Sequence, residues 1–462
     1  MKIRLAICAT LVGIVNCAFM PLATAGTWSA PTTVAVVPYD NVTGTVFPQT
    51  DIDGNGNLVA AWAPLSGYNN IPPNIALATA ASFLGAWAAP INLTFTGTVS
   101  DLLSVTSNSD GFSTALLLTS AGLVSSDHTV GGGWTPGVLV SPNFKGGSTF
   151  ANRTGDHMVA ALGTGVLISR GNVSTPVTAT FRHGSAAWGS TETVATGNDA
   201  VIEDAAVGAD GSAIVVWMTH TATCARFCKY TNYVRHVSTR APGKSPWTEV
   251  AALPAPLNDS SNSFVDVAAD AFGNQVFLVR RTSDGTGQAL VRRSGVWSAP
   301  ATAFPAAVTS WYRSEPRLLL DGVGNATIVV STAGAASNNN IPGNASIGVI
   351  DGNLGANSWS PIHILSGLDV TASFTVAENS SGAAVVAYES NYNTGLPVSF
   401  HAVARASTAG TWSAPKNLDS SSASGYYFDR MVINESGQAA VMYTVDNAAV
   451  TLQTIRVLEY KP

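Results

Sequence analysis

Short apolar runs recur along the chain, and a four-residue polar turn precedes each of them. The turns begin with Asp or Asn and end with Gly, as in DGNG at 53–56, DAFG at 270–273 and NESG at 434–437. The runs that follow these turns are NLVAAW, NQVFLV and QAAVMY. Asp or Asn first and Gly fourth is the preference of a type I turn, and apolar runs between such turns are typical of strands. No stretch after residue 25 keeps a helical period, so the pattern predicts an all-β protein.

A tryptophan motif recurs at a similar period. The hexapeptide GTWSAP occurs at 26–31 and again at 410–415, with related motifs between them. The eight tryptophans lie 47 to 62 residues apart, at Trp28, Trp87, Trp134, Trp188, Trp247, Trp297, Trp359 and Trp412. Each unit then contains four short strands, of which the tryptophan strand is the last. This repeat predicts an eight-bladed β-propeller, and the alternative is seven blades with a degenerate third unit around NRTG at 152–155.

The two ends of the chain complement each other in this repeat. Residues 439–462 supply the second and third strands of the eighth unit and no tryptophan strand, whereas GTWSAP at 26–31 lacks the other three strands. We therefore expect the N-terminal strand to join the last blade as its outermost strand, which closes the ring. Six of the eight tryptophans are followed closely by a proline. Proline cannot donate a backbone hydrogen bond, which agrees with an outermost position.

Residues 1–25 have the pattern of an export signal. Lys2 and Arg4 precede a mostly apolar stretch, and Ala23-Thr24-Ala25 offers small residues at a cleavage site. We expect a signal peptide at 1–25, one propeller domain at 26–462, a periplasmic or extracellular location and no integral membrane segment after signal removal. Without Lys2 and Arg4, 20 basic residues remain against 28 acidic ones, a net charge of −8 that argues against a nucleic-acid partner.

Few residues suggest a metal. Cys224 and Cys228, in TCARFCKY, are the two cysteines after residue 25, and in an oxidising compartment their expected state is a disulfide. A zinc site would need further ligands at a spacing that the chain lacks. DIDGNGN at 51–57 is similar to a calcium loop through Asp51, Asp53 and Asn55, although the later acidic ligand is absent. No cofactor is expected, with calcium at these three residues as the alternative.

A polar position recurs seven residues before each turn glycine, in the first strand of every unit. The eight residues are Gln49, Ser104, Ser148, Asp204, Asp266, Arg317, Thr375 and Arg430. Equivalent positions on innermost strands form a ring around the channel of a propeller. One interpretation is a hydrated channel with inter-blade pairs such as Asp266 with Arg317. The other is a catalytic or ligand site at the channel mouth, with Asp204, Asp266, Arg317, Arg430 and the nearby Glu315 as candidate catalytic residues.

The variable loops carry aromatic and amide side chains. These loops share one face of a propeller, which we call the loop-rich face, whereas the short repeated turns lie on the other, the turn face. Flat rings beside amide groups suit a sugar, although turn chemistry also explains Asn and Gly there. The candidate ligand-binding residues are Gln49, Tyr68, Asn70, Trp311, Tyr312, Arg313, Asn340, Tyr392 and Tyr427. A further candidate is the insert at 220–236, where Arg226, Lys229, Arg235, Tyr230 and Tyr233 form a basic, aromatic group.

The motifs Trp-Ser-x-Pro and Asp-x-x-Gly-Asn resemble those of exported bacterial β-propellers with sialidase-like or BNR-type repeats. The resemblance implies the fold. SNSDGFST at 107–114 is the nearest approach to the Asp-box of sialidases and lacks its aromatic residue, and Arg313, Arg317 and Arg430 stand outside any arginine motif of that family. We therefore expect a binding or interaction protein with a glycan or protein ligand. The alternative is a glycosidase of sialidase-like type or a polysaccharide lyase, for which His183, His220, His236 and His401 are available as bases.

Overall fold

The computed structural model describes residues 26–38, 48–63, 76–142, 144, 147–151, 157–162, 166–169, 172–208, 210–224, 228–243, 246–270, 272–306, 316–332, 346–367, 370–390, 398–408, 410–421, 426–446 and 452–462. These residues form strands, turns and irregular segments. Within them, no helix long and apolar enough to cross a membrane is found. The described strands form eight antiparallel sheets, numbered below by the order of their innermost strands along the chain.

Four of the sheets contain four strands each. The first is β3 (Gln49–Ile52), β4 (Leu58–Trp62), β5 (Leu77–Ala81) and β6 (Ile91–Asn92). The second is β7 (Val99–Ser107), β8 (Phe112–Thr119), β9 (Gly122–Thr129) and β10 (Val138–Ser141). The fourth is β16 (Val201–Val207), β17 (Ala213–Cys224), β18 (Cys228–Arg240) and β19 (Thr248–Glu249). The seventh is β30 (Val370–Glu378), β31 (Ala384–Ser390), β32 (Val398–Arg405) and β33 (Lys416–Ser421).

The other four sheets contain five strands each. The third is β11 (Gly147–Ala151), β12 (His157–Leu162), β13 (Val166–Ser169), β14 (Asn172–Arg182) and β15 (Glu192–Asn198). The fifth is β20 (Ser263–Ala269), β21 (Gln275–Arg280), β22 (Gly287–Arg293), β23 (Val296–Trp297) and β24 (Ala301–Phe304). The sixth is β25 (Arg317–Leu320), β26 (Asn325–Thr332), β27 (Ser346–Asn353), β28 (Ser358–Trp359) and β29 (His363–Ile364). The eighth is β34 (Tyr426–Ile433), β35 (Ala439–Asp446) and β36 (Leu452–Lys461), with β1 (Thr27–Trp28) and β2 (Thr32–Pro38) from the other end of the chain.

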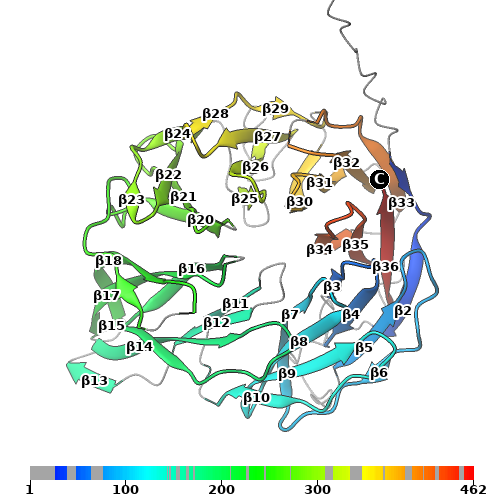
Figure 1. Cartoon of the computed structure of the whole chain (residues 1–462), viewed down its shortest axis with the longest axis horizontal. Helices are drawn as coiled ribbons and strands as arrows, with labels where there is room; N and C mark the ends of the chain where they lie inside the picture. The colour runs from blue at the N-terminus through cyan, green and yellow to red at the C-terminus, as the bar shows by residue number, and fades with distance from the viewer. Residues whose placement is uncertain are drawn as a thin grey trace, which may run out of the picture.

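The sheets surround a common centre, as Figure 1 shows. Each innermost strand contacts the innermost strand of the next sheet, and β34 of the eighth sheet contacts β3 of the first. The prediction of an all-β β-propeller is therefore confirmed. The innermost strands are β3, β7, β11, β16, β20, β25, β30 and β34.

Hydrophobic clusters lie between consecutive sheets. The cluster between the sixth and seventh sheets, for example, joins Val349 and Leu365 to Val386, Val403 and the partly buried Trp412. The described core contains eight such clusters, and each includes one repeated tryptophan, from the outer part of the later of its two sheets. The tryptophan of each repeat thus buries its ring against the preceding sheet, as expected for a large apolar side chain with an exposed edge.

Prolines divide three of the outermost strands. Pro31 separates β1 from β2, Pro300 separates β23 from β24, and Pro361 separates β28 from β29. In each case both halves pair with the same neighbouring strand. Because proline lacks the donor that a ladder needs, it interrupts the outermost strand, which explains the fifth strand of these three sheets. In the third sheet the additional strand is β13, which pairs with β14 as β15 does.

The N-terminal strands pair with the C-terminal strand. Thr27 is opposite Lys461 and Trp28 is opposite Tyr460, and β2 continues along β36 from Val457 to Leu452. The rings of Trp28 and Tyr460 lie 5.1 Å apart. A Cβ at Gly26 would lie 2.3 Å from the Tyr460 hydroxyl, so a larger residue there would displace the Tyr460 ring.

Candidate functional site

The eight polar residues predicted to line the channel occupy one register of the innermost strands. Each is opposite a residue twelve positions later on the second strand of its sheet. The pairs are Gln49 with Ala61, Ser104 with Leu116, Ser148 with Ala160, Asp204 with Val216, Asp266 with Leu278, Arg317 with Val329, Thr375 with Ala387, and Arg430 with Met442. Counting seven residues back from each turn glycine therefore identified equivalent ladder positions on the eight innermost strands.

These residues connect one sheet to the next through the backbone. The Asp204 carboxylate accepts a hydrogen bond from the backbone N–H of Val267, at 2.9 Å. Asp266 accepts one from the N–H of Leu318, at 3.0 Å. Thr375 in the seventh sheet accepts one from Met431 in the eighth, at 3.1 Å. Each donor follows directly after the ring residue of the next sheet, so the three contacts are equivalent latches between innermost strands.

The expected ion pair of Asp266 with Arg317 is replaced by this latch. Among the described residues, the guanidinium of Arg317 forms no ion pair, and its side chain is exposed. It still attracts both Asp204 and Asp266 electrostatically. A backbone N–H group of β25 lies nearer to the Asp266 carboxylate than the guanidinium of Arg317 does. The sequence alone does not show which of these two donors reaches the carboxylate.

Asp204 and Asp266 form a hydrogen-bonded carboxyl pair between the fourth and fifth sheets. Burial raises the pKa of Asp266 well above its ordinary value, and the neighbouring charge of Asp204 adds to the effect. Burial also raises the pKa of Asp204, although the N–H groups of Val267 and Ala205 oppose the shift. Two carboxyls this close cannot both ionise easily, so the pair favours a state in which one of them keeps its proton.

Arg430, another candidate catalytic residue, contacts a different sheet. Arg430 donates a hydrogen bond at 3.1 Å to the backbone carbonyl of Val105, on β7 of the second sheet. Glu315 lies outside the described residues. Of the four candidate catalytic residues that the structure describes, neighbouring strands bring together Asp204, Asp266 and Arg317.

Most of the predicted ligand-binding residues lie outside the described residues. These are Tyr68, Asn70, Trp311, Tyr312, Arg313, Asn340 and Tyr392. Gln49 begins β3 and is partly buried. Tyr427 is in β34, opposite Thr444, and its side chain is outside the description. Cys224 and Cys228 are opposite each other at the end of the β17–β18 hairpin, where side chains are likewise not described.

Two of the candidate histidines pack within their own sheets. His236 stacks on Trp217 with ring centroids 4.1 Å apart, while its two nitrogens contact Glu249 at 2.7 Å and Thr219 at 3.1 Å. His401 stacks on Tyr388, and its Nε2 lies 2.9 Å from the Ser390 hydroxyl. Both histidine rings therefore have defined partners within their sheets, and the sequence alone does not reveal these contacts.

The repeated turn accounts for the resemblance to a calcium loop. One carboxylate oxygen of Asp53 accepts hydrogen bonds from the N–H groups of Asn55 and Asn57, and the other accepts one from the Asn57 side chain. Asp270 and Asp321 make the same contacts in their turns. Asp51 accepts a hydrogen bond from the Ser107 N–H, at 2.6 Å. No group of three or more potential metal ligands was found among the described residues.

Arg235 is a buried structural residue and not part of a surface patch. Its guanidinium binds Glu203 through two hydrogen bonds of 2.6 and 2.9 Å, and its side chain is only 1% exposed. The same group donates to the carbonyls of Leu257, Asp259 and Asn262 at 3.2, 3.3 and 2.9 Å. Arg235 thereby fixes the segment that connects the fourth sheet to β20. Arg235 is therefore not part of the basic, aromatic group that the sequence predicted at 220–236.

This fixed segment forms one wall of a depression on the loop-rich face, here called the 4–5 depression. It has a volume of about 340 Å³, and its walls include Pro256, Asp259, Ser261, Arg281, Gln288 and Pro300. Asn262 braces the wall, since its side chain donates to the Pro256 carbonyl and accepts from the Thr282 N–H, both at 3.1 Å. The depression is therefore bounded by segments that already bond to each other.

Asp259 presents an ionised carboxylate to the 4–5 depression. The Ser261 hydroxyl and N–H both bond to its Oδ1, and they lower the pKa of this exposed carboxyl. Within the described part of the chain, Oδ2 accepts no hydrogen bond. Arg281, on the opposite wall, pairs with Asp284 at 3.0 Å. Acceptor, donor and hydroxyl groups thus surround one space, which exposed Pro300 also borders.

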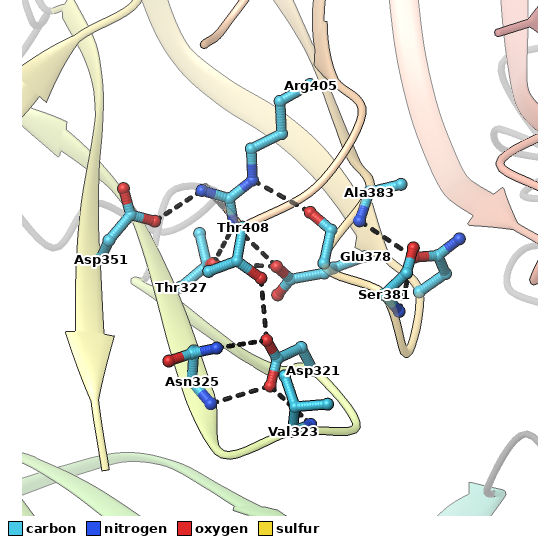
Figure 2. Close-up of polar contacts among 12 residues, drawn as sticks. Asp321, Val323, Asn325, Thr327, Asp351, Glu378, Ser381, Ala383, Arg405 and Thr408 are labelled. Atoms are coloured by element: carbon cyan, nitrogen blue, oxygen red, sulfur yellow. Dashed lines mark hydrogen bonds and ion pairs between the residues drawn. The ribbon is translucent and has the colours of Figure 1, made fainter. Parts of the chain in front are cut away.

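Arginines near the repeated tryptophans form clamps that the sequence analysis missed. Arg405 is fully buried, lies 4.8 Å from the ring centroid of Trp412, and binds Asp351 of the sixth sheet at 2.6 Å and Glu378 at 2.7 Å. Figure 2 shows this arginine between the two carboxylates, with Thr327 beside Glu378. Burial raises the pKa of Glu378, against the opposing effect of Arg405.

The clamp recurs in two other sheets. Arg182 lies over Trp188 and binds Asp127 of the second sheet at 2.8 Å. Arg240 binds Glu192 of the third sheet, which also accepts a hydrogen bond from the indole N–H of Trp247. In all three cases the carboxylate comes from the preceding sheet. In the sequence, these three arginines share one feature that could have identified them, because each lies six or seven residues before a repeated tryptophan.

Comparisons with known proteins agree with the fold and go no further. No family model matches the chain, and no match was found among curated proteins. A structure from a study of two prolyl endopeptidases is 10% identical, with a TM-score of 0.50, and the match covers 88% of this chain and 55% of that one. Prolyl oligopeptidase B from Galerina marginata is 7% identical, with a TM-score of 0.47 and coverage of 92% and 55%. An ulvan lyase is 11% identical, with a TM-score of 0.45 and coverage of 77% and 93%.

The chain spans about half the length of the prolyl peptidases that it resembles. At such low identity the likeness concerns the arrangement of sheets, because one fold carries many unrelated functions. The sialidase-like type of repeat remains an expectation from the sequence.

Proposed function

We propose that the chain is an exported, eight-bladed β-propeller that binds a glycan through its loop-rich face, with the 4–5 depression as the binding site. The eight sheets and the eight clusters between them support eight blades rather than seven. A rigid ring with variable loops on one face is an architecture in which loops carry the ligand contacts.

The observation that carries this proposal is the wall fixed by Arg235. A buried guanidinium that binds three carbonyls of one segment holds that segment in place before a ligand arrives. Binding then costs less conformational entropy, because the wall is already ordered. The wall presents the free Oδ2 of Asp259 and the hydroxyl of Ser261.

The chemistry of the depression suits a polyhydroxylated ligand. Sugar hydroxyls both donate and accept, and the walls offer the Asp259 carboxylate as acceptor, Arg281 as donor and the Gln288 amide as both. Exposed Pro300 supplies apolar surface for the C–H groups of a sugar ring. These features favour a neutral glycan over a purely ionic ligand.

The latches in the channel favour binding over catalysis. One oxygen of Asp204 and one of Asp266 are occupied by N–H groups of the next strand. The two carboxyls also bond to each other, whereas glycosidases keep their carboxyls roughly 5 to 9.5 Å apart. A structural role for the pair accounts for its contacts.

A glycan array followed by a reducing-sugar release assay tests the proposal. We expect binding without release. The paired changes Asp259→Asn and Gln288→Ala should weaken binding about tenfold, the effect of losing hydrogen bonds to a charged acceptor. Asp110→Asn changes an exposed acid on the turn face and is the matched control. Equal binding by the control and the double variant would refute the assignment of the depression.

A second candidate function is a carbohydrate-active enzyme at the channel. The observation in its favour is the contact of Asp204 with Asp266, whose pKa is raised by burial, since a carboxyl with a raised pKa suits a general acid. For this candidate, Asp266→Asn should abolish sugar release while the protein remains folded. Release that persists in this variant, or its absence from the wild type, argues against the enzyme.

Export and the disulfide belong to the same proposal. Cys224 and Cys228 are opposite each other in the β17–β18 ladder, and two cysteines in such a position can be bridged. Mass spectrometry of protein secreted by its host should give a chain that begins at Gly26 and lacks two hydrogens. A longer chain, or free thiols after purification without reductant, would contradict this part of the proposal.

A further inference from the structure

A second, larger cavity lies between the outer turns of the fifth and sixth sheets, here called the 5–6 cavity. Its volume is about 470 Å³, and its walls include Val291, Arg293, Val296, Trp297, Pro300 and Leu354. The turn at 354–357 forms the far wall and is attached on two sides. The Leu354 N–H donates to Gly324 at 3.1 Å, and the Asn357 side chain donates to Ala299 at 2.7 Å. Both walls are turns that follow the third strands, so the cavity is on the turn face.

Arg293 is a cation in this cavity, and none of the carboxylates in the described part of the chain pairs with it. Its guanidinium donates one hydrogen bond, at 3.3 Å, to the carbonyl of Gly355. Its Nε is buried and has no hydrogen-bond partner among the described residues. The clamp position of the fifth sheet is that of Arg292, which is opposite Gln275 as Arg405 is opposite Ala384 and binds the Gln275 side chain at 3.0 Å. A partly buried cation is stabilised by an anion, and the described residues supply none here.

The remaining surface of the cavity is apolar. Val291 and Leu354 are almost fully buried, and Val296 on the rim is 71% exposed. Val323, which precedes the glycine that contacts Leu354, is 70% exposed on the same face. The polar groups Ser298 and Asn357 already bond to each other at 3.0 Å. A sugar would therefore find few partners for its hydroxyls, whereas an apolar side chain beside an acid would match both parts of the lining.

We infer that the 5–6 cavity binds an acidic, apolar segment of a partner polypeptide. A glutamate or aspartate of the partner forms a charge-assisted hydrogen bond with Arg293, and a neighbouring aliphatic side chain packs between Val296 and Leu354. The site is distinct from the glycan site proposed on the loop-rich face, and Pro300 is the one residue named in the walls of both. Exposed apolar residues on the rim of a pocket with a central charge are typical of protein-recognition surfaces.

Fluorescence anisotropy with two labelled peptides tests the inference. One probe is an acetylated peptide amide of alternating leucine and glutamate, and the other has glutamine in place of glutamate. The wild type should bind the glutamate peptide about tenfold more tightly, as expected for one charge-assisted hydrogen bond in a partly buried site. Arg293→Gln should remove this preference. Equal binding of both peptides by the wild type, or an unchanged preference in the variant, overturns the inference.

Further variants separate the inference from altered folding and from glycan binding. Arg281→Gln removes a cation from the other face and should leave the preference for the glutamate peptide unchanged. Val296→Ser alters an exposed rim residue and should weaken both peptides similarly. Displacement of the glutamate peptide by glucuronate oligosaccharides as readily as by unlabelled peptide would favour an acidic glycan and overturn the choice of a polypeptide. Glycan binding at the 4–5 depression should be the same in the wild type and in Arg293→Gln.

Discussion

At the scale of single residues, the same position in the repeat performs one structural task with different side chains. Asp204, Asp266 and Thr375 all accept a hydrogen bond from the next innermost strand. The sequence could identify this position, because a fixed distance from the turn glycine defines it. It could not identify the acceptor role, because the donors are backbone groups of another sheet and have no signature in the residue types.

The carboxyl pair makes stability depend on pH in a predictable direction. The folded state raises the pKa of Asp266 through burial and through Asp204, so it binds the proton more tightly than the unfolded chain does. The associated stability is present at pH below the unfolded pKa of about 3.9 and is lost as pH rises through the folded value. Relative to the wild type, Asp266→Asn should therefore gain stability as pH increases above about 4.

Urea unfolding over a pH series measures this difference. Asp110→Asn, which changes an exposed acid, provides the matched control. A constant difference between Asp266→Asn and the wild type at every pH would show that the pair does not share a proton in the folded state.

Buried Arg405 should contribute far more to stability than an exposed arginine. Arg405→Met leaves Glu378 buried without its cation, and a loss of about 3–5 kcal/mol in the free energy of unfolding is expected. Arg281→Met breaks the exposed pair with Asp284 and should cost about 1 kcal/mol or less. Denaturant unfolding compares the two, and similar losses would contradict the role assigned to the network in Figure 2.

At the scale of elements, the turns were the most predictable part of the structure. Asp or Asn at the first position bonds to backbone N–H groups two and four residues later, as Asp270 does with Phe272 and Asn274. This local rule involves adjacent residues only, so the sequence contains all of it. The arginine clamps were not predicted, because each joins residues of two sheets, such as Arg405 and Asp351.

The turn in the fifth sheet offers a graded test. Asp270 is 3% exposed, and Asp270→Ala leaves two backbone N–H groups without their acceptor, at an expected cost of about 1–3 kcal/mol. Asp270→Asn keeps the accepting oxygen and should cost less, since Asn379 and Asn434 hold the same turn in other sheets. Thermal unfolding gives both values, and an equal loss for the two variants would exclude the carboxylate oxygen as the anchor.

At the scale of the whole molecule, the repeat predicted the propeller and the outer position of the tryptophans. Each tryptophan lies in a cluster between two sheets, which a periodic sequence anticipates because every unit needs the next one to bury its apolar face. The two cavities were not predicted. The 4–5 depression depends on Arg235 reaching a segment beyond its own strand, and the 5–6 cavity depends on a turn of the following sheet.

The joining of the two chain ends is the central claim about the molecule, and deletion of residues 26–38 tests it most directly. Without β1 and β2, strand β36 loses its outer neighbour and the cluster around Trp28 loses a side chain. Hydrogen exchange and denaturant unfolding should show faster exchange along β36 and β35 and a markedly lower free energy of unfolding. If the shortened chain keeps the exchange rates of β36 and unfolds at the same denaturant concentration as the complete one, the ring is not held together by its two ends.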